Sequence, residues 1–235
     1  MLEFIDISNW KSDLDPDSVF PSVDAVFMKA TGGNYFVDKT CDRFVQAAKR
    51  LGKPWGFYHY AHDGTSRTSA EEEAKFFCDN CENYFGEGIP CLDWEEDTCE
   101  VDWVNEFVAC VHDRFGIWPW IYANPWRFNQ GGVNQDCDRW LASYPQVSHP
   151  TFDYAKGYAN KPDADGPVCA WQFCSDGIVA GYNGVLDCNL FFGDVAAWKS
   201  YALGHPYTGE RDDSGSGSAT VLEGGGYKVT IEKEN

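Results

Sequence analysis

Two carboxylates, two positions apart, stand at the end of an apolar run near the middle of the chain. Residues 89–97 read IPCLDWEED, which places Asp93 and Glu95 directly after the apolar part. Such a run is typical of a buried strand that opens into a polar site. Because side chains alternate between the two faces of a strand, both carboxylates are expected to point the same way.

Paired carboxylates of this kind suit the hydrolysis of a glycosidic bond. Two like charges side by side repel each other, so the pKa of one group rises and that group keeps its proton near neutral pH. One carboxylic acid then protonates the leaving oxygen, and the other carboxylate stabilises the oxocarbenium-like centre. An Asp-x-Glu pair alone is more often surface or ion-pair chemistry, so the hypothesis depends on what the fold brings beside it.

The segments around this pair alternate between strand-like and helix-like patterns. Strands are predicted over residues 2–8, 25–31, 54–61, 89–93 and 117–123, and helices follow most of them. Asp38 is expected to cap one helix that runs to about Leu51, and Ser69 with Glu72 makes a capping box for the next. Five strand-then-helix alternations predict a parallel α/β architecture. Three further strands, over 139–144, 169–175 and 184–191, and a closing helix over 194–203 complete the compact part.

The ends of these strands supply more groups for the same site. In parallel α/β barrels functional side chains lie at the carboxyl ends of the strands, where Asp6 and Asp187 join the central pair. Aromatic and polar side chains are expected there too, because sugar rings stack on aromatic faces while hydroxyls need polar partners. The candidates are Tyr58, Tyr60, Tyr122, Trp171 and Gln172. The tryptophans at 118, 120, 126, 140 and 198 are assigned to packing.

The same segments carry a family resemblance. The chain resembles the family 25 glycoside hydrolases, the N-acetylmuramidase lysozymes of phages, bacteria and fungi. One departure follows Lys29, where the family usually has Lys-x-Ser/Thr-Glu-Gly and this chain reads KATGG. The missing Glu affects a substrate-side or structural contact, not the acid pair. The matching segments run in family order over about 200 residues: FIDISNW (4–10), FMKATGGNYFVD (27–38), GFYHYA (56–61), CLDWEE (91–96), PWIYANP (119–125), RWLASY (139–144), AWQFCS (170–175) and VLDCNLFFG (185–193).

This resemblance implies a flattened, irregular β/α barrel of five β/α units plus three further strands. It implies hydrolysis, with retention, of the β-1,4 bond between N-acetylmuramic acid and N-acetylglucosamine in peptidoglycan, without a metal or cofactor. Glu95 becomes the general acid/base, and Asp93, Asp6 and Asp187 complete the acidic cluster. Asp93 acts either as a nucleophile or by orienting the substrate's N-acetyl group. Lys29 and Asn189, which lie in matching segments, are added as candidate substrate contacts.

Charge and cysteines limit the partners and the compartment. A formal net charge of −19 argues against nucleic acid and against an anionic membrane or cell-wall polymer, and is compatible with a neutral glycan chain as the partner. No apolar run is long enough to cross a bilayer. The ten cysteines lack paired zinc-knuckle spacing and are expected to be mostly reduced, with disulfides left open for an extracellular protein. The start lacks a secretory signal pattern, which is consistent with a host-cytoplasmic endolysin or with a leader removed from an extracellular enzyme.

Composition divides the chain into three parts. Residues 1–206 form the expected catalytic barrel, 207–220 a flexible Gly/Ser linker, and 221–235 a hairpin-like tail or the start of another module. Wall binding or self-association is assigned to this tail. The leading interpretation is a phage-type endolysin. A catalytically silent glycan-binding domain, and a hydrolase of another N-acetylated glycan such as chitin, remain as alternatives.

Overall fold

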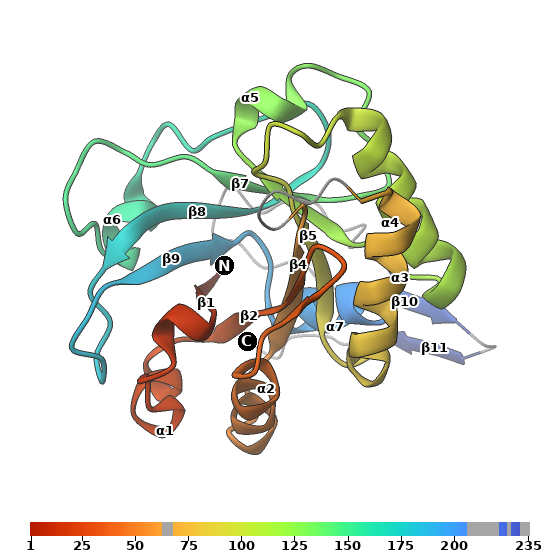
Figure 1. Cartoon of the computed structure of the whole chain (residues 1–235). Helices are drawn as coiled ribbons and strands as arrows, with labels where there is room; N and C mark the ends of the chain where they lie inside the picture. The colour runs from red at the N-terminus through yellow and green to blue at the C-terminus, as the bar shows by residue number, and fades with distance from the viewer. Residues whose placement is uncertain (63–67, 206–220, 225–226, 231–235) are drawn as a thin grey trace.

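Eight strands close into a barrel in the computed structural model, which describes residues 1–62, 68–205, 221–224 and 227–230 (Figure 1). The hydrogen-bonded order is β1-β9-β8-β7-β6-β5-β4-β2, and β1 pairs with β2 to complete the ring. All neighbours are parallel except β9, which is antiparallel to both β8 and β1. The barrel strands are β1 (Leu2–Ile7), β2 (Ala25–Gly32), β4 (Trp55–Tyr60), β5 (Ile89–Asp93), β6 (Trp120–Ala123), β7 (Arg139–Ala142), β8 (Val168–Gly177) and β9 (Leu186–Phe191).

This architecture confirms the predicted irregular barrel of five β/α units plus three strands. The long helices α2 (Cys41–Arg50), α3 (Ala70–Cys81) and α4 (Val101–Phe115) follow β2, β4 and β5. In Figure 1, α3 and α4 lie along one side of the barrel, and the short α6 (Phe152–Gly157) lies beside β8 and β9. Two further short helices, α1 (Pro16–Val19) and α5 (Pro125–Phe128), sit in loops.

Alternation along the strands creates two separate cores. One set of side chains faces the barrel interior and includes Phe4, Phe27, Trp120 and Trp140. The opposite set packs against the helices, so that the strands are buried on both faces and read as nearly continuous apolar runs. A strand residue therefore reaches the barrel interior only if it belongs to the first set.

The closing helix α7 (Val195–Ala202) packs its Trp198 into the end of the barrel where most of the strands begin. The Trp198 ring contacts Phe4, Phe27 and Phe191 at centroid distances of 5.4, 5.6 and 5.2 Å. Its indole N–H donates to the backbone oxygen of Trp55 at 3.0 Å. Aromatic side chains thus fill the barrel interior at this end.

Two local expectations need revision. Helix α2 begins at Cys41 after Thr40, so Asp38 is not its N-cap; the Asp38 carboxylate instead accepts from the backbone N–H groups of Asn9 and Thr40. The capping box at Ser69 and Glu72 is confirmed. A short strand β3 (Phe36–Val37) pairs with β2 and was not predicted.

The structure describes part of the tail and all ten cysteines. Strands β10 (Val221–Gly224) and β11 (Tyr227–Thr230) pair antiparallel, as the hairpin-like pattern predicts. The predicted linker at 207–220 lies outside the described residues. All ten cysteines are free thiols, and all but Cys110 are buried. Within the described ranges, no helix combines the length and apolarity needed to cross a bilayer.

Candidate active site

A cavity of about 250 Å³ opens at the carboxyl ends of the parallel strands and gathers the predicted acids. Asp6, Asp93, Glu95 and Asp187 all line it, although they come from both ends and the middle of the chain. The predicted contacts Lys29, Tyr58, Tyr60, Tyr122 and Gln172 line it as well.

Asp6 lies at the centre of a hydrogen-bond network on the cavity floor. Its Oδ2 accepts from the side-chain amides of Gln172 and Asn189, at 2.9 and 2.8 Å. The Gln172 amide oxygen in turn accepts from the hydroxyls of Tyr122 (2.7 Å) and Tyr144. Asp6 is therefore a fixed acceptor whose position is set by β8 and β9.

Asp93 and Glu95 differ sharply in their surroundings. Asp93 ends β5 and is 8% exposed, and its Oδ1 accepts no hydrogen bond from any residue that the structure describes. Glu95 lies beyond the strand and is exposed at the cavity mouth. A proton donor at the mouth can reach a glycosidic oxygen from solvent-accessible space, whereas Asp93 faces whatever ring occupies the floor.

The remaining acid, Asp187, stands opposite Asp6 in the antiparallel register of β1 and β9. Burial, followed by the negative charge of Asp6, raises the pKa of Asp187 to about 8. Burial raises the pKa of Asp6 to about 6, against the hydrogen bonds from Asn189 and Gln172 that lower it. At neutral pH Asp187 is therefore the more strongly protonated of the two acids.

The sequence assigned a raised pKa to Glu95 and attributed it to repulsion between carboxylates; the raised pKa is confirmed, and the cause needs correction. Although Glu95 is reachable from solvent, the surrounding cavity wall partly desolvates its carboxyl, and this effect, followed by the charge of Glu96, raises its pKa. Burial also raises the pKa of Asp93 well above its usual range, with Glu95 adding to it and Lys29 opposing it. Desolvation in the cavity thus acts on all four acids, and repulsion is the smaller effect.

Two candidates do not reach the cavity. Trp171 lies between the inward-facing Ala170 and Gln172, so it points outward into the layer under the helices, where its indole donates to the backbone oxygen of Ser143 at 2.6 Å. The expected substrate contact of Trp171 is therefore withdrawn. Asn189 is fully buried behind Asp6 and accepts from the Trp140 indole at 2.9 Å. Asn189 supports the site and does not line it.

Sequence reasoning missed other lining residues. Ser8 and Trp10 follow Asp6 in the same loop, and Tyr144 follows β7. Trp140, which was assigned to packing, forms part of the cavity floor, while Trp126 is 66% exposed and so is not a packing residue. Strand-end position was the available signal for Tyr144, since it ends the RWLASY segment.

Trp10 is 85% exposed at the rim, which is unusual for a tryptophan without a partner surface. An exposed indole beside a sugar-sized cavity is suited to stacking on a pyranose face. We expect Trp10→Ala to raise KM for soluble wall fragments about tenfold, with kcat little changed, because the ring binds substrate without touching the reacting atoms. Initial rates over a range of fragment concentrations measure both constants. Trp126→Ala, which removes another exposed tryptophan outside the cavity lining, is the control. Equal KM values for wild type and Trp10→Ala would contradict the assignment.

The pKa shift of Asp187 predicts a pH-dependent stability. A carboxyl whose folded pKa is raised stabilises the protein fully only below its ordinary pKa near 4, and this contribution is lost as the pH rises through about 8. Asp187→Asn removes the ionisation. We therefore expect the Tm of this variant, relative to that of the wild type, to rise as the pH increases from 5 to 8. Thermal unfolding followed by circular dichroism gives the comparison, with Asp163→Asn on the surface as control. A constant Tm difference across this range would count against the shift.

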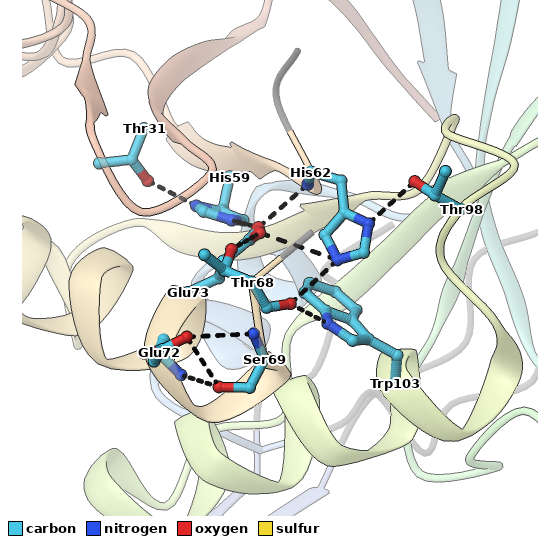
Figure 2. Close-up of polar contacts among 9 residues, drawn as sticks. All are labelled: Thr31, His59, His62, Thr68, Ser69, Glu72, Glu73, Thr98 and Trp103. Carbon is cyan, nitrogen blue, oxygen red and sulfur yellow. Dashed lines mark hydrogen bonds and ion pairs between the residues drawn. The ribbon is translucent and has the colours of Figure 1, made fainter. Parts of the chain in front are cut away.

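A second buried network holds the loops next to the site (Figure 2). Glu73 of α3 is fully buried; its carboxylate lies 3.0 Å from His59 Nε2 and accepts from the backbone N–H of His62 at 3.0 Å. The other His59 nitrogen lies 2.8 Å from the Thr31 hydroxyl, directly before the Gly-Gly departure noted in the sequence. His62 Nδ1 lies 2.9 Å from the Thr98 hydroxyl, which belongs to the loop that carries Glu95.

Comparison with known proteins identifies the family. The model of glycosyl hydrolases family 25 matches residues 5–182. The chain belongs to glycosyl hydrolases family 25. This family 25 chain is therefore an enzyme, a glycoside hydrolase of the lysozyme type.

Three known proteins are similar to this family 25 chain in sequence or in fold. It is 28% identical to the uncharacterized protein YegX of Escherichia coli, over 85% of this chain and 73% of that protein. It is 26% identical to the autolytic lysozyme of Clostridium acetobutylicum, over 80% of this chain and 55% of that protein. The crystal structure of the bacterial lysozyme from Streptomyces coelicolor has the same fold, with a TM-score of 0.69 and 23% identity, covering 86% of this chain and 97% of that one.

Proposed function

We propose that this family 25 enzyme hydrolyses the β-1,4 bond between N-acetylmuramic acid and N-acetylglucosamine in peptidoglycan, with retention. The observation that carries the proposal is the gathering of Asp6, Asp93, Glu95 and Asp187 in one cavity with tyrosine walls. The curated relative named an autolytic lysozyme supports the substrate class. The tyrosine hydroxyls and Gln172 suit the hydroxyl and acetamido groups of such a chain.

Each acid has a role that fits its surroundings. Glu95, raised in pKa yet accessible, donates a proton to the leaving oxygen and later removes one from water. Asp93 faces the anomeric carbon, either as nucleophile or by orienting the N-acetyl group for internal attack. Asp6 and Asp187 supply further acidic groups at the floor, and Gln172 and Asn189, which donate to Asp6, keep that part of the cavity fixed during the reaction.

Mass spectrometry of the reducing ends released from purified peptidoglycan tests the bond assignment. Muramic acid ends are expected. Glucosamine ends would mean that the other glycosidic bond is cut, and no release in the presence of wall binding would mean a silent glycan-binding domain. Release from chitin at a rate similar to that from peptidoglycan would point to a broader N-acetylated substrate. Proton NMR of the first product anomer tests retention.

We also propose a lytic role of the endolysin type, in which the enzyme waits in a host cytoplasm and is released to the wall. The hairpin β10–β11 after a Gly/Ser-rich segment supports a separate contribution of the tail to wall binding or self-association. Producing the chain in bacteria with and without a membrane-permeabilising protein tests the role. Lysis that depends on permeabilisation is expected; growth that continues in both cultures would contradict it.

A further inference from the structure

The segment that carries Glu95 leaves β5 and has no regular structure until α4 begins at Val101. Such a segment needs tertiary contacts to hold a catalytic side chain in place. A guanidinium from a different loop provides them. Arg127, on the short helix α5, donates from one terminal nitrogen to the backbone oxygen of Glu95 and to Asp97 Oδ1, the latter at 2.9 Å.

Arg127 is unusually placed for a cation. Its side chain is only about 8% exposed, while that of its ion-pair partner Asp97 is 98% exposed. Its guanidinium carbon lies 5.2 Å from the ring centroid of Trp94, the residue between Asp93 and Glu95. Its Nε finds no acceptor among the residues that the structure describes. Burying a cation that is incompletely paired destabilises a fold, and such a cost is typical of residues that serve a functional site.

We propose that Arg127 is a positioning residue for catalysis, which clamps the backbone of Glu95 and holds a permanent positive charge beside its carboxyl group. The inference rests on the proposed function of Glu95 as general acid/base. A planar guanidinium can bond a carbonyl and a carboxylate while it stacks on an indole, which no other side chain can do at once. The Asn124 side chain caps α5 by accepting from the backbone N–H of Arg127 at 3.2 Å, which fixes the backbone position from which the arginine side chain extends.

The charge of Arg127 acts on the same proton that Glu95 must donate. Burial and Glu96 raise the pKa of Glu95, whereas the Tyr122 hydroxyl, Arg127 and Lys29 lower it. Arg127 therefore opposes the rise in this pKa that burial and Glu96 cause. Asp93 and Glu96 lie beside Glu95 in its own part of the chain. The titratable groups that surround Glu95 from other elements are Asp6, Lys29, Tyr60, Tyr122, Tyr144 and Asp187.

The test is the pH profile of wall hydrolysis by Arg127→Gln and Arg127→Lys. Arg127→Gln removes the charge and the clamp, so we expect kcat to fall about tenfold or more and the alkaline limb to move up by about one pH unit. Arg127→Lys keeps the charge but lacks the fork, so its alkaline limb should stay at the wild-type pH while kcat falls. Arg114→Gln removes an equal charge in the last turn of α4, where Arg114 pairs with Asp79, and should change neither quantity.

A structural role alone would lower the amount of folded enzyme without moving the alkaline limb. Circular dichroism therefore accompanies the rates, and kcat is referred to folded protein. An unmoved limb in folded Arg127→Gln would overturn the inference. If this variant unfolds, Arg127→Lys decides: wild-type kcat in Arg127→Lys overturns the clamp, and reduced kcat at an unchanged limb supports it. A wild-type enzyme that releases no reducing ends would overturn the proposed function instead, independently of Arg127.

Discussion

Replacing Glu95 by glutamine is expected to reduce the release of reducing ends from purified walls by about a thousandfold while leaving the fold intact, because a positioned general acid contributes on that order. Glutamine has nearly the same shape and can keep neighbouring hydrogen bonds, but it cannot give up a proton to the leaving oxygen. Since Glu95 is exposed and its backbone contact to Arg127 does not involve its side chain, stability should change little. Turbidity clearing and reducing-end release measure the loss.

Glu96→Gln is the matched control for this result. Glu96 is adjacent, carries the same charge and accepts a hydrogen bond from Tyr60 at 3.0 Å, but it does not line the cavity. Its activity should stay within a few-fold of the wild type, and its charge loss should lower the pKa of Glu95 slightly, because Glu96 raises it. If Glu95→Gln clears walls at the wild-type rate, or if Glu96→Gln is the inactive variant, the assignment of the acid is wrong.

The second large effect concerns stability and the network in Figure 2. We expect Glu73→Ala to lower the free energy of unfolding by about 3–5 kcal/mol, because it leaves buried partners without an acceptor. His59 is fully buried between Phe77 and Phe107 and loses its contact at 3.0 Å; the His62 N–H and the Thr68 hydroxyl lose theirs. Urea unfolding at pH 7 measures the change.

Glu72→Ala separates this effect from helix capping. Glu72 precedes Glu73 on α3 but is exposed and serves only the capping box with Ser69, so its loss should cost about 1 kcal/mol. The pKa of Glu73 adds a signature: burial raises it, but the hydrogen bonds from His59 and Thr68 outweigh burial and leave it lowered. The gap between wild type and Glu73→Ala should therefore shrink as the pH falls below about 4. A loss no larger than that of Glu72→Ala would show that the network is not needed for stability.

The sequence predicts the barrel well because its strands are buried on both faces. Apolar runs such as that ending in Asp93 mark the strand ends, and polar residues at those ends mark the site. This logic places Asp6, Asp93, Glu95 and Asp187 in one cavity before any coordinates are known. The short elements were missed for a physical reason: α5 and α6 have four and six residues, too few for a helical period to stand out.

Side-chain direction was less predictable than strand position. Trp171 and Gln172 are neighbours, and only the register of β8 decides that the amide faces inward and the indole outward. Asn189 carries no pattern that distinguishes a residue behind Asp6 from one in front of it. The proposed role of Arg127 could not be predicted for another reason. It depends on a contact with a backbone oxygen 32 positions away, and such a contact leaves no signal in residue types.

The pairing of β1 with β9 has a consequence for the timing of activity. Asp6 is among the first residues to be synthesised. Asp187 and Trp198, whose ring packs into the barrel interior, are synthesised about 180 residues later. A nascent chain therefore has no complete acidic cavity until its last barrel strand closes against its first. A chain that ends before β9 lacks Asp187 and also Asn189, which donates to Asp6, and so cannot assemble this cavity.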